Sequence, residues 1–114
     1  MATMGEGFGI PIIEAQACGT PVIVGDWTAN GELCFSGWKI PKSDAVTIWT
    51  ALGTNQYHVR PEAVRDALEM AYTKRGNQRM KERARAGALQ YDADKVTDEY
   101  WKPYLESLAA ELRK

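Results

Sequence analysis

The short turn Gly19-Thr-Pro21 places the strongest constraint on how this chain can fold. Before it, residues 11–18 are predicted to form a helix, with Pro11 at the opening position, where its missing N–H costs nothing. Gly19 ends that helix because glycine most easily takes the left-handed conformation, and Pro21 prevents the helix from resuming. After the turn, residues 22–25 are apolar on both faces and mostly β-branched, as in a buried parallel strand. Helix, tight turn and buried strand are half of a doubly wound α/β unit, so we predict an α/β fold.

Turn residues and periodicity define the other predicted elements. Residues 26–31 predict a loop, because Asn30-Gly31 can adopt positive φ, and it would lie at the carboxyl end of the strand, where open α/β sheets bind ligands. Residues 45–60 predict a β-hairpin, since two runs rich in β-branched and aromatic residues flank a glycine-containing turn. We further expect a helical turn at 32–35, a short strand at 38–40, and helices over 61–74, 77–90 and 94–112.

The last of these helices is the longest and carries a wide apolar stripe. We expect Pro103 to bend it, because proline removes one intrahelical hydrogen bond and crowds the preceding turn. The stripe consists of Val96, Tyr100, Trp101, Tyr104, Leu105, Leu108 and Leu112. In the two preceding helices the residues predicted to face a core are Val64, Leu68, Ala71 and Tyr72, then Met80, Ala84, Ala88 and Leu89.

Length and composition indicate one soluble globular domain, since the chain has 114 residues, 45% of them hydrophobic and 25% charged. A net charge of -1 gives no reason to expect nucleic acid or an anionic membrane as a partner. No apolar run is long enough for a membrane span, and the first residues lack the features of a signal peptide, so we expect a cytoplasmic protein. Cys18 and Cys34 lack metal-ligand spacing and are predicted to be buried, reduced thiols.

Residues 6–14, Glu-Gly-Phe-Gly-Ile-Pro-Ile-Ile-Glu, combine two carboxylates, a glycine pair and a helix start. The glycines allow the backbone to approach a ligand closely, and a helix N-terminus attracts phosphate. Glu14 falls about one turn into the helix, where its carboxylate can accept hydrogen bonds from paired hydroxyls. A nucleotide-sugar requires amides near its phosphates and carboxylates near its sugar hydroxyls. The alternative reading of the same residues is a loop acid at Glu6, a core ring at Phe8 and an exposed helix acid at Glu14.

Together with residues 15–26 and Glu32, this motif resembles the donor-binding segment of glycosyltransferase family 4, the retaining, glycogen-synthase-like group with the B-type double-Rossmann architecture. The resemblance spans nearly the whole chain, and is strongest from Glu6 to Asp26. It implies that the chain corresponds to the C-terminal part of the donor domain, a partial Rossmann-like half, and that its ligand is a nucleoside diphosphate sugar. It implies neither a cofactor nor an obligatory metal.

The same resemblance implies roles for six residues. Glu6 would face the transferred sugar as the catalytic carboxylate, and Glu14 would bind the ribose hydroxyls. The amides that would contact the sugar and the diphosphate belong to Gly7, Phe8, Gly9 and Ile10.

The chain also departs from the family pattern. Its 114 residues contain neither the N-terminal acceptor-binding domain nor the Arg and Lys pair that neutralises the diphosphate, so we expect the isolated chain to be inactive. Thr3-Met4-Gly5 replaces the usual Pro-Ser, and Asn30-Gly31 stands where a Gly-Gly turn is common. His58 has no nucleophile or partner acid for a catalytic arrangement near it in the sequence, and a catalytic role for it is disfavoured.

Two other nucleotide-binding motifs are excluded by the sequence. A dinucleotide fingerprint from Gly5 would need glycine in place of Ile10, and a Walker phosphate loop would need a Gly-Lys-Ser/Thr sequence that is absent. The alternative that stays open is a non-enzymatic relative, acting as an interaction module or as one subunit of a split transferase. The apolar stripe of the last helix favours it, because that surface calls for a homo-oligomer or a complementary domain.

Overall fold

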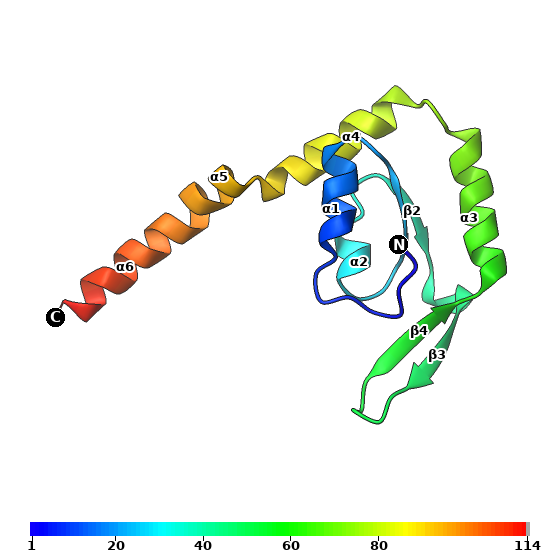
Figure 1. The fold of residues 1–114 in the computed structure, drawn as a ribbon, viewed down its shortest axis with the longest axis horizontal. Coiled ribbons are helices and arrows are strands. Elements are labelled where there is room, and N and C mark those ends of the chain that lie inside the picture. Colours follow the sequence, from blue (N-terminus) through cyan, green and yellow to red (C-terminus); the bar gives the residue numbers. More distant parts are fainter. Residues whose placement is uncertain (114) are drawn as a thin grey trace.

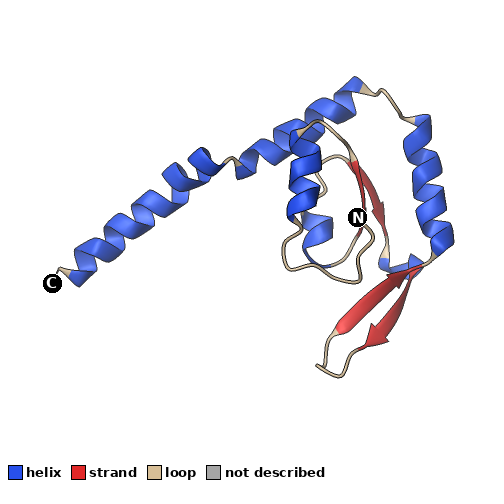
Figure 2. Ribbon diagram, in the orientation of Figure 1, coloured by secondary structure: helices blue, strands red, loops and turns tan. Residues whose placement is uncertain are grey.

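A computed structural model of the chain describes residues 1–113 and has a mixed α/β fold with two small sheets and a long C-terminal helical arm (Figures 1 and 2). Helix α1 (Ile10–Ala17) and strand β1 (Val22–Gly25) flank the Gly19 turn, as predicted. Gly19 has φ +76°, the left-handed conformation expected at a helix end. Pro11 is the second helical residue rather than the first.

Strand β1 pairs in parallel with β2 (Gly37–Ile40), from Val22 opposite Gly37 to Gly25 opposite Ile40. The predicted buried strand and the predicted short strand therefore form one parallel sheet. Helix α1 packs against β1 and against α4 (Gln78–Ala88), so this sheet has a helical layer over it. That arrangement is the mixed α/β class expected from the sequence.

The main core is small and centres on Ile12, Val24 and Leu33. A buried glutamine, Gln16, holds it together by making four hydrogen bonds. Its Nε2 donates to the carbonyls of Ile12 (3.0 Å) and Leu33 (2.7 Å). Its Oε1 accepts from the amides of Phe35 (2.9 Å) and Ser36 (3.0 Å). A single side chain thereby satisfies backbone groups of the loop that leads into β2.

The predicted β-hairpin is confirmed, with β3 (Ala45–Trp49) antiparallel to β4 (Asn55–Val59). A single 3₁₀ turn, Lys42–Asp44, connects it to β2. The hairpin projects from the body (Figure 2) and is joined to it at Tyr57, whose amide donates to the Met4 carbonyl (3.1 Å).

Helices α3 (Pro61–Thr73) and α4 follow as predicted, but the residues expected to face a core are only partly buried. The prediction is wrong for three large side chains, because Leu68, Tyr72 and Leu89 are 55%, 62% and 51% exposed. Small residues make the close contacts instead: they are Ala67 in α3 and Ala84, Gly87 and Ala88 in α4. Two helices that bury mainly alanine and glycine leave their larger apolar residues at the surface.

The predicted last helix is divided into α5 (Ala93–Val96), a π-helical segment (Thr97–Trp101) and α6 (Lys102–Leu112). Within it the Lys102 amide donates to the carbonyl of Thr97, five residues back. Pro103 has no N–H to donate to the preceding turn, so one intrahelical hydrogen bond is lost there. The wide π-helical turn directly before Pro103 accommodates this loss. The disturbance therefore falls in the turn that precedes the proline.

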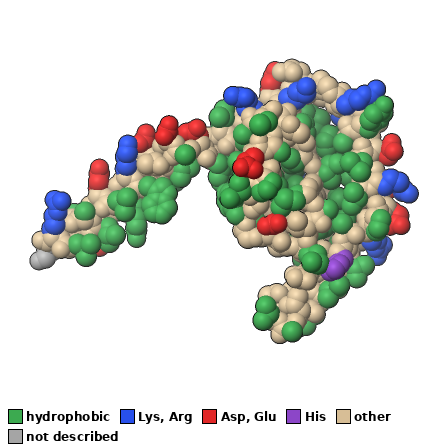
Figure 3. Space-filling view, viewed as in Figure 1, with side chains coloured by type: hydrophobic (Ala, Val, Ile, Leu, Met, Phe, Trp, Pro, Cys, Tyr) green, Lys and Arg blue, Asp and Glu red, His purple; other side chains and the backbone are tan. Residues whose placement is uncertain are grey.

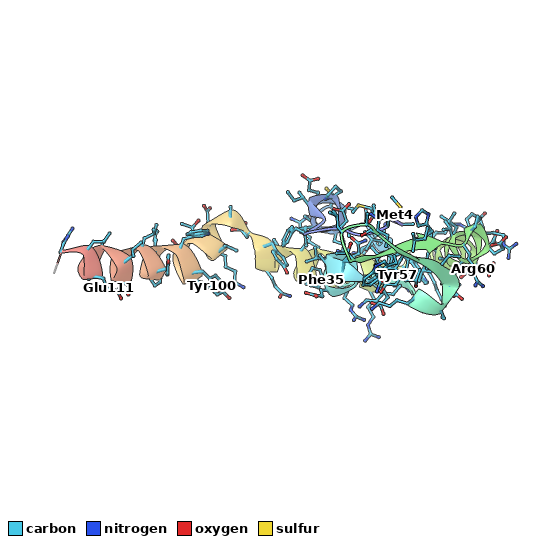
Figure 4. All side chains as sticks on the ribbon, turned by 90° about the horizontal axis from the view of Figure 1, so that it is seen from below. Met4, Phe35, Tyr57, Arg60, Tyr100 and Glu111 are labelled. Atoms are coloured by element: carbon cyan, nitrogen blue, oxygen red, sulfur yellow. The ribbon has the colours of Figure 1, made fainter. Side chains whose placement is uncertain are left out.

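The C-terminal arm, residues 93–112, extends away from the body (Figure 1). The chain measures 60 × 44 × 16 Å with a radius of gyration of 17.9 Å, whereas a compact chain of this length would have about 13 Å. Hydrophobic side chains gather along one side of the arm and charged ones along the other (Figure 3). Figure 4 shows Tyr100 and Glu111 on this arm, well beyond Phe35, Tyr57 and the other labelled residues of the body.

Two further expectations need correction. Residues 26–31 do not form a loop throughout, because α2 spans Thr28–Glu32, and Asn30 and Gly31 are helical and buried. Gly31 lies so close to Asp26 that a Cβ would overlap the carboxylate, which explains the glycine there. Cys18 is exposed and Cys34 is only half-buried, although both thiols are free.

Within residues 1–113, no helix has both the length and the apolar composition to cross a membrane.

Candidate functional site

The loop that carries the first half of the motif lies against the start of α2, just beyond the carboxyl end of β1. The Glu6 amide donates to Thr28 Oγ1 (3.1 Å), and only Asp26 and Trp27 separate Thr28 from the end of β1. The Trp27 indole, which is 2% exposed, donates from Nε1 to the Thr3 carbonyl (2.9 Å) and fixes the approach to the loop. The motif is thus at the edge of the parallel sheet where ligands of open α/β sheets bind.

The two glycines of the motif have different structural roles. Gly9 is the residue before α1 and has φ +95° and ψ +52°, a left-handed conformation that favours glycine. A Cβ on Gly9 would lie 3.2 Å from Ile12 Cδ1 and 3.4 Å from Asn30 Oδ1. A Cβ on Gly7 would have nothing within 4 Å. Gly9 is therefore needed for the backbone, whereas Gly7 leaves open space above an exposed loop.

Beneath Gly9 lies a polar side chain that is not fully paired. Asn30 is completely buried, and its Nδ2 donates to Thr3 Oγ1 (3.0 Å). Its Oδ1 is the one buried side-chain oxygen or nitrogen within residues 1–113 that has no hydrogen-bond partner. An unpaired buried acceptor costs about 1–3 kcal/mol, and such groups call for a specific reason.

Thr28, in the same region, has a strained backbone conformation that also costs free energy. Its φ is +51°, and no other non-glycine residue between positions 1 and 113 has a positive φ. For a β-branched residue this conformation is an outlier that costs of order 1–3 kcal/mol, and such residues cluster at functional sites. The strained residue and the unpaired Asn30 both contact the motif loop or its glycine.

The two carboxylates of the motif are available for a ligand. Glu14 is exposed on α1, and Glu6 is half-buried. Over residues 1–113, neither side chain makes a hydrogen bond or an ion pair. The amides of residues 7–10 likewise donate to no other group in that part of the chain, while the Ile12 amide donates to the Gly9 carbonyl (3.0 Å). Free amides at a helix start and free acids on both sides can bind an anion and hydroxyl groups, respectively.

Phe8 and Ile10 are both on the surface, with exposed fractions of 47% and 60%. The Phe8 ring meets the Tyr91 ring edge-on, with centroids 5.7 Å apart. Both rings line a cavity of about 420 Å³ between the motif loop and the start of the C-terminal arm, together with Tyr100. The reading of Phe8 as a core residue is therefore wrong. Glu6 and Glu14 do not line this cavity.

Sequence reasoning missed three residues that shape this site, namely Thr28, Asn30 and Tyr91. The local pattern predicts Asn30 only as a turn residue and contains no sign that it is buried under Gly9. Tyr91 lies far from Phe8 in the sequence, so only the packing of α4 on α1 brings the rings together. The missing signal is long-range contact, which periodicity cannot supply.

Across residues 1–113, no group of three or more His, Cys, Asp or Glu side chains is placed to hold a metal ion. No protein-family model, no curated protein and no solved structure matches this chain.

Proposed function

We propose that this chain is a glycosyltransferase-like domain that binds a nucleoside diphosphate sugar. The parent activity would be retaining transfer of the sugar to an acceptor hydroxyl. The observation that carries the proposal is the motif loop itself: free amides at residues 7–10 stand between the unpaired carboxylates of Glu6 and Glu14. The loop lies at the carboxyl edge of the β1–β2 pair, in keeping with a Rossmann-like half of a B-type fold.

Each part of the ligand has a matching group. The amides at the start of α1 would stabilise the charge that develops on the leaving diphosphate, which accounts for transfer without an obligatory metal. Glu14 would accept from the ribose hydroxyls, because a carboxylate can accept from two neighbouring hydroxyls at once. Glu6 would face the sugar. The unpaired Asn30 and the strained Thr28 support a loop held ready for a ligand rather than one optimised for stability.

The 114 residues alone are expected to bind the donor without transferring the sugar. Transfer needs donor and acceptor held together in a fixed geometry, and the described site offers only donor-binding groups. A cytoplasmic setting is part of this proposal.

Titration with UDP-, GDP- and ADP-sugars tests the proposal, with tryptophan fluorescence as the readout, because Trp27 adjoins the loop. At least one donor should bind, and Glu14→Ala should abolish that binding. Glu69→Ala is the matched control, because Glu69 is an exposed helix acid outside the motif. Absence of binding by every donor at millimolar concentration would refute the proposal.

The exposed C-terminal arm favours a second candidate function, a non-enzymatic interaction module or a subunit of a split transferase. Along the arm, Tyr100, Trp101, Tyr104 and Leu105 are 66%, 56%, 61% and 53% exposed. Exposed apolar surface of this extent marks an interaction site. Its partner would be a second copy of this chain or a complementary domain that packs on the arm. Failure to bind any donor, combined with association through the arm, would favour this function over the first.

A further inference from the structure

A second cavity lies between β2 and the first half of α4. It has a volume of about 390 Å³, within the usual range for small-molecule sites. Three cationic side chains line it: Lys39 from β2, and Arg79 and Arg83 from α4. No carboxylate lines it. A cavity whose charged lining residues are all positive is suited to an anion.

The charges around this cavity are poorly compensated by the protein. Arg79 and Arg83 are one helical turn apart, a spacing at which like charges repel. In the part of the chain that the structure describes, neither forms an ion pair, and Lys39 has only a long contact to the exposed Asp26 (3.6 Å). A bound anion would offset this repulsion.

The walls of the cavity are fixed by the surrounding structure. Gln16 Oε1 accepts from the amides of Phe35 and Ser36, which form one wall. The Phe35 ring rests directly on Gly87 of α4, where any Cβ would overlap it. A wall held by buried hydrogen bonds and close packing keeps its shape before a ligand arrives, which lowers the entropic cost of binding.

The lining also includes neutral donors and apolar surface. Asn77 uses its Oδ1 to accept from the Met80 amide, so its Nδ2 remains a donor at the cavity edge. Phe35 and Met80 supply apolar contact beside the three cations. This combination fits a phosphate group joined to a small organic part better than a bare inorganic anion.

This cavity is separate from the motif loop. A Cβ on Gly19, just past the end of α1, would lie 3.7 Å from the Lys81 carbonyl of α4. Phe8, before the start of α1, contacts Tyr91, which comes after the end of α4. The two helices are thus antiparallel, and the cavity at residues 77–83 is beside the C-terminal end of α1.

We propose that the cavity between β2 and α4 binds a small phosphate monoester, with Lys39, Arg79 and Arg83 holding the phosphate and Phe35 and Met80 contacting the organic part. The two arginines present donors in a fork that matches phosphate oxygens. This site is independent of the donor site proposed above.

The test is a titration of the ¹⁵N-labelled chain with phenyl phosphate and with inorganic phosphate at constant ionic strength, followed by amide chemical shifts. Shifts should concentrate at Gly37 and residues 77–83, and phenyl phosphate should bind more tightly than inorganic phosphate. Arg79→Gln and Arg83→Gln should each weaken binding roughly tenfold, the usual scale for losing a charge-assisted hydrogen bond. Arg85→Gln, on the same helix but outside the lining, is the matched control and should leave the affinity within about twofold.

Several results would overturn this assignment. They are an absence of saturable shifts with either probe, an equal loss of affinity in Arg85→Gln, and equal affinity for the two probes. Glu14→Ala should leave phenyl phosphate binding unchanged while it abolishes nucleotide-sugar binding. The two proposals can therefore fail separately. Circular dichroism of each arginine variant confirms that it is folded.

Discussion

The indole of Trp27 stacks on the ring of Tyr57, with ring centroids 5.4 Å apart and planes inclined by 29°. Trp27 lies two residues after the end of β1, and Tyr57 is on β4, so this pair joins the two small sheets. Lys42 Nζ lies 5.5 Å from the Tyr57 ring centroid and adds a cation–π contact. Neither sheet has more than two strands, and a two-stranded sheet has little stability of its own.

Tyr57→Ala should therefore detach the hairpin and lower the free energy of unfolding by about 1–3 kcal/mol, since it removes a half-buried ring and its stacking contact with Trp27. Urea denaturation followed by tryptophan fluorescence measures this change. Tyr104→Ala removes an exposed ring from the arm and should change stability by less than about 0.5 kcal/mol. Equal effects of the two substitutions would contradict a role for Tyr57 in joining the sheets.

Gly9→Ala should destabilise the chain by about 1–2 kcal/mol, because alanine is strained at φ +95° and its Cβ would crowd Ile12. Gly7→Ala offers a control two residues away, where the added methyl meets open space. It should be neutral to within about 0.5 kcal/mol. Thermal unfolding by circular dichroism distinguishes the two. A Gly7→Ala variant as unstable as Gly9→Ala would show that the loop differs from the one described.

Residues close together in the sequence predict much of the fold. The helix end at Gly19, the break at Pro21 and the hairpin over residues 45–60 each depend on residues close together in the chain, and each is present. Asn30-Gly31 shows where such reasoning fails. Its residues are typical of a turn, but the contacts of Asn30 with Thr3 and of Gly31 with Asp26 hold them in a short helix. Tertiary contact overrides local preference there.

The candidate site likewise combines local features, which the sequence predicts, with long-range contacts, which it does not. The left-handed Gly9 and the free acids at Glu6 and Glu14 are properties of a contiguous segment, which the sequence displays. The strain at Thr28 and the Phe8–Tyr91 contact arise only when distant segments meet. The same limit explains the arm, where a helical stripe predicts an apolar face but cannot identify what covers it.

Gln16→Leu should be the most damaging single substitution in the core, although it conserves volume approximately. Loss of Oε1 leaves the amides of Phe35 and Ser36 without an acceptor, at about 1–3 kcal/mol each, or about 2–6 kcal/mol together. Gln78→Leu removes only an exposed hydrogen bond to Glu82 and should cost less than about 0.5 kcal/mol. Chemical denaturation of both variants measures the difference, and a stable Gln16→Leu chain would argue against this network.

The apolar face of the arm should drive association into a dimer or a larger assembly. Sedimentation of the chain should give a mass above 12.7 kDa at high concentration. Trp101→Lys should shift the chain toward monomer by placing a charge in the apolar stripe. Ala110→Lys, on the opposite side of α6, should leave association unchanged. A monomer at every concentration would remove self-association as the function of the arm.

The two cysteines should react at very different rates, contrary to the expectation that both are buried. Cys18 is exposed and should be alkylated first by iodoacetamide at pH 8, as followed by mass spectrometry. Burial raises the pKa of the Cys34 thiol above its usual 9.0, and Lys39 only partly opposes this, so little reactive thiolate is present there. The two thiols should react alike only after the chain is unfolded in urea.

The raised pKa of Cys34 also predicts how stability depends on pH. The unfolded chain releases this proton at a lower pH than the folded chain does, so between the two pKa values the unfolded state binds fewer protons. The contribution is complete below pH 9 and is lost as the pH rises through the pKa of the folded state. Compared with Cys34→Ala, the natural chain should therefore lose more stability above pH 9, as measured by urea denaturation at each pH. Parallel pH profiles for the two proteins, or alkylation of Cys34 as fast as that of Cys18, would show that this thiol is not desolvated.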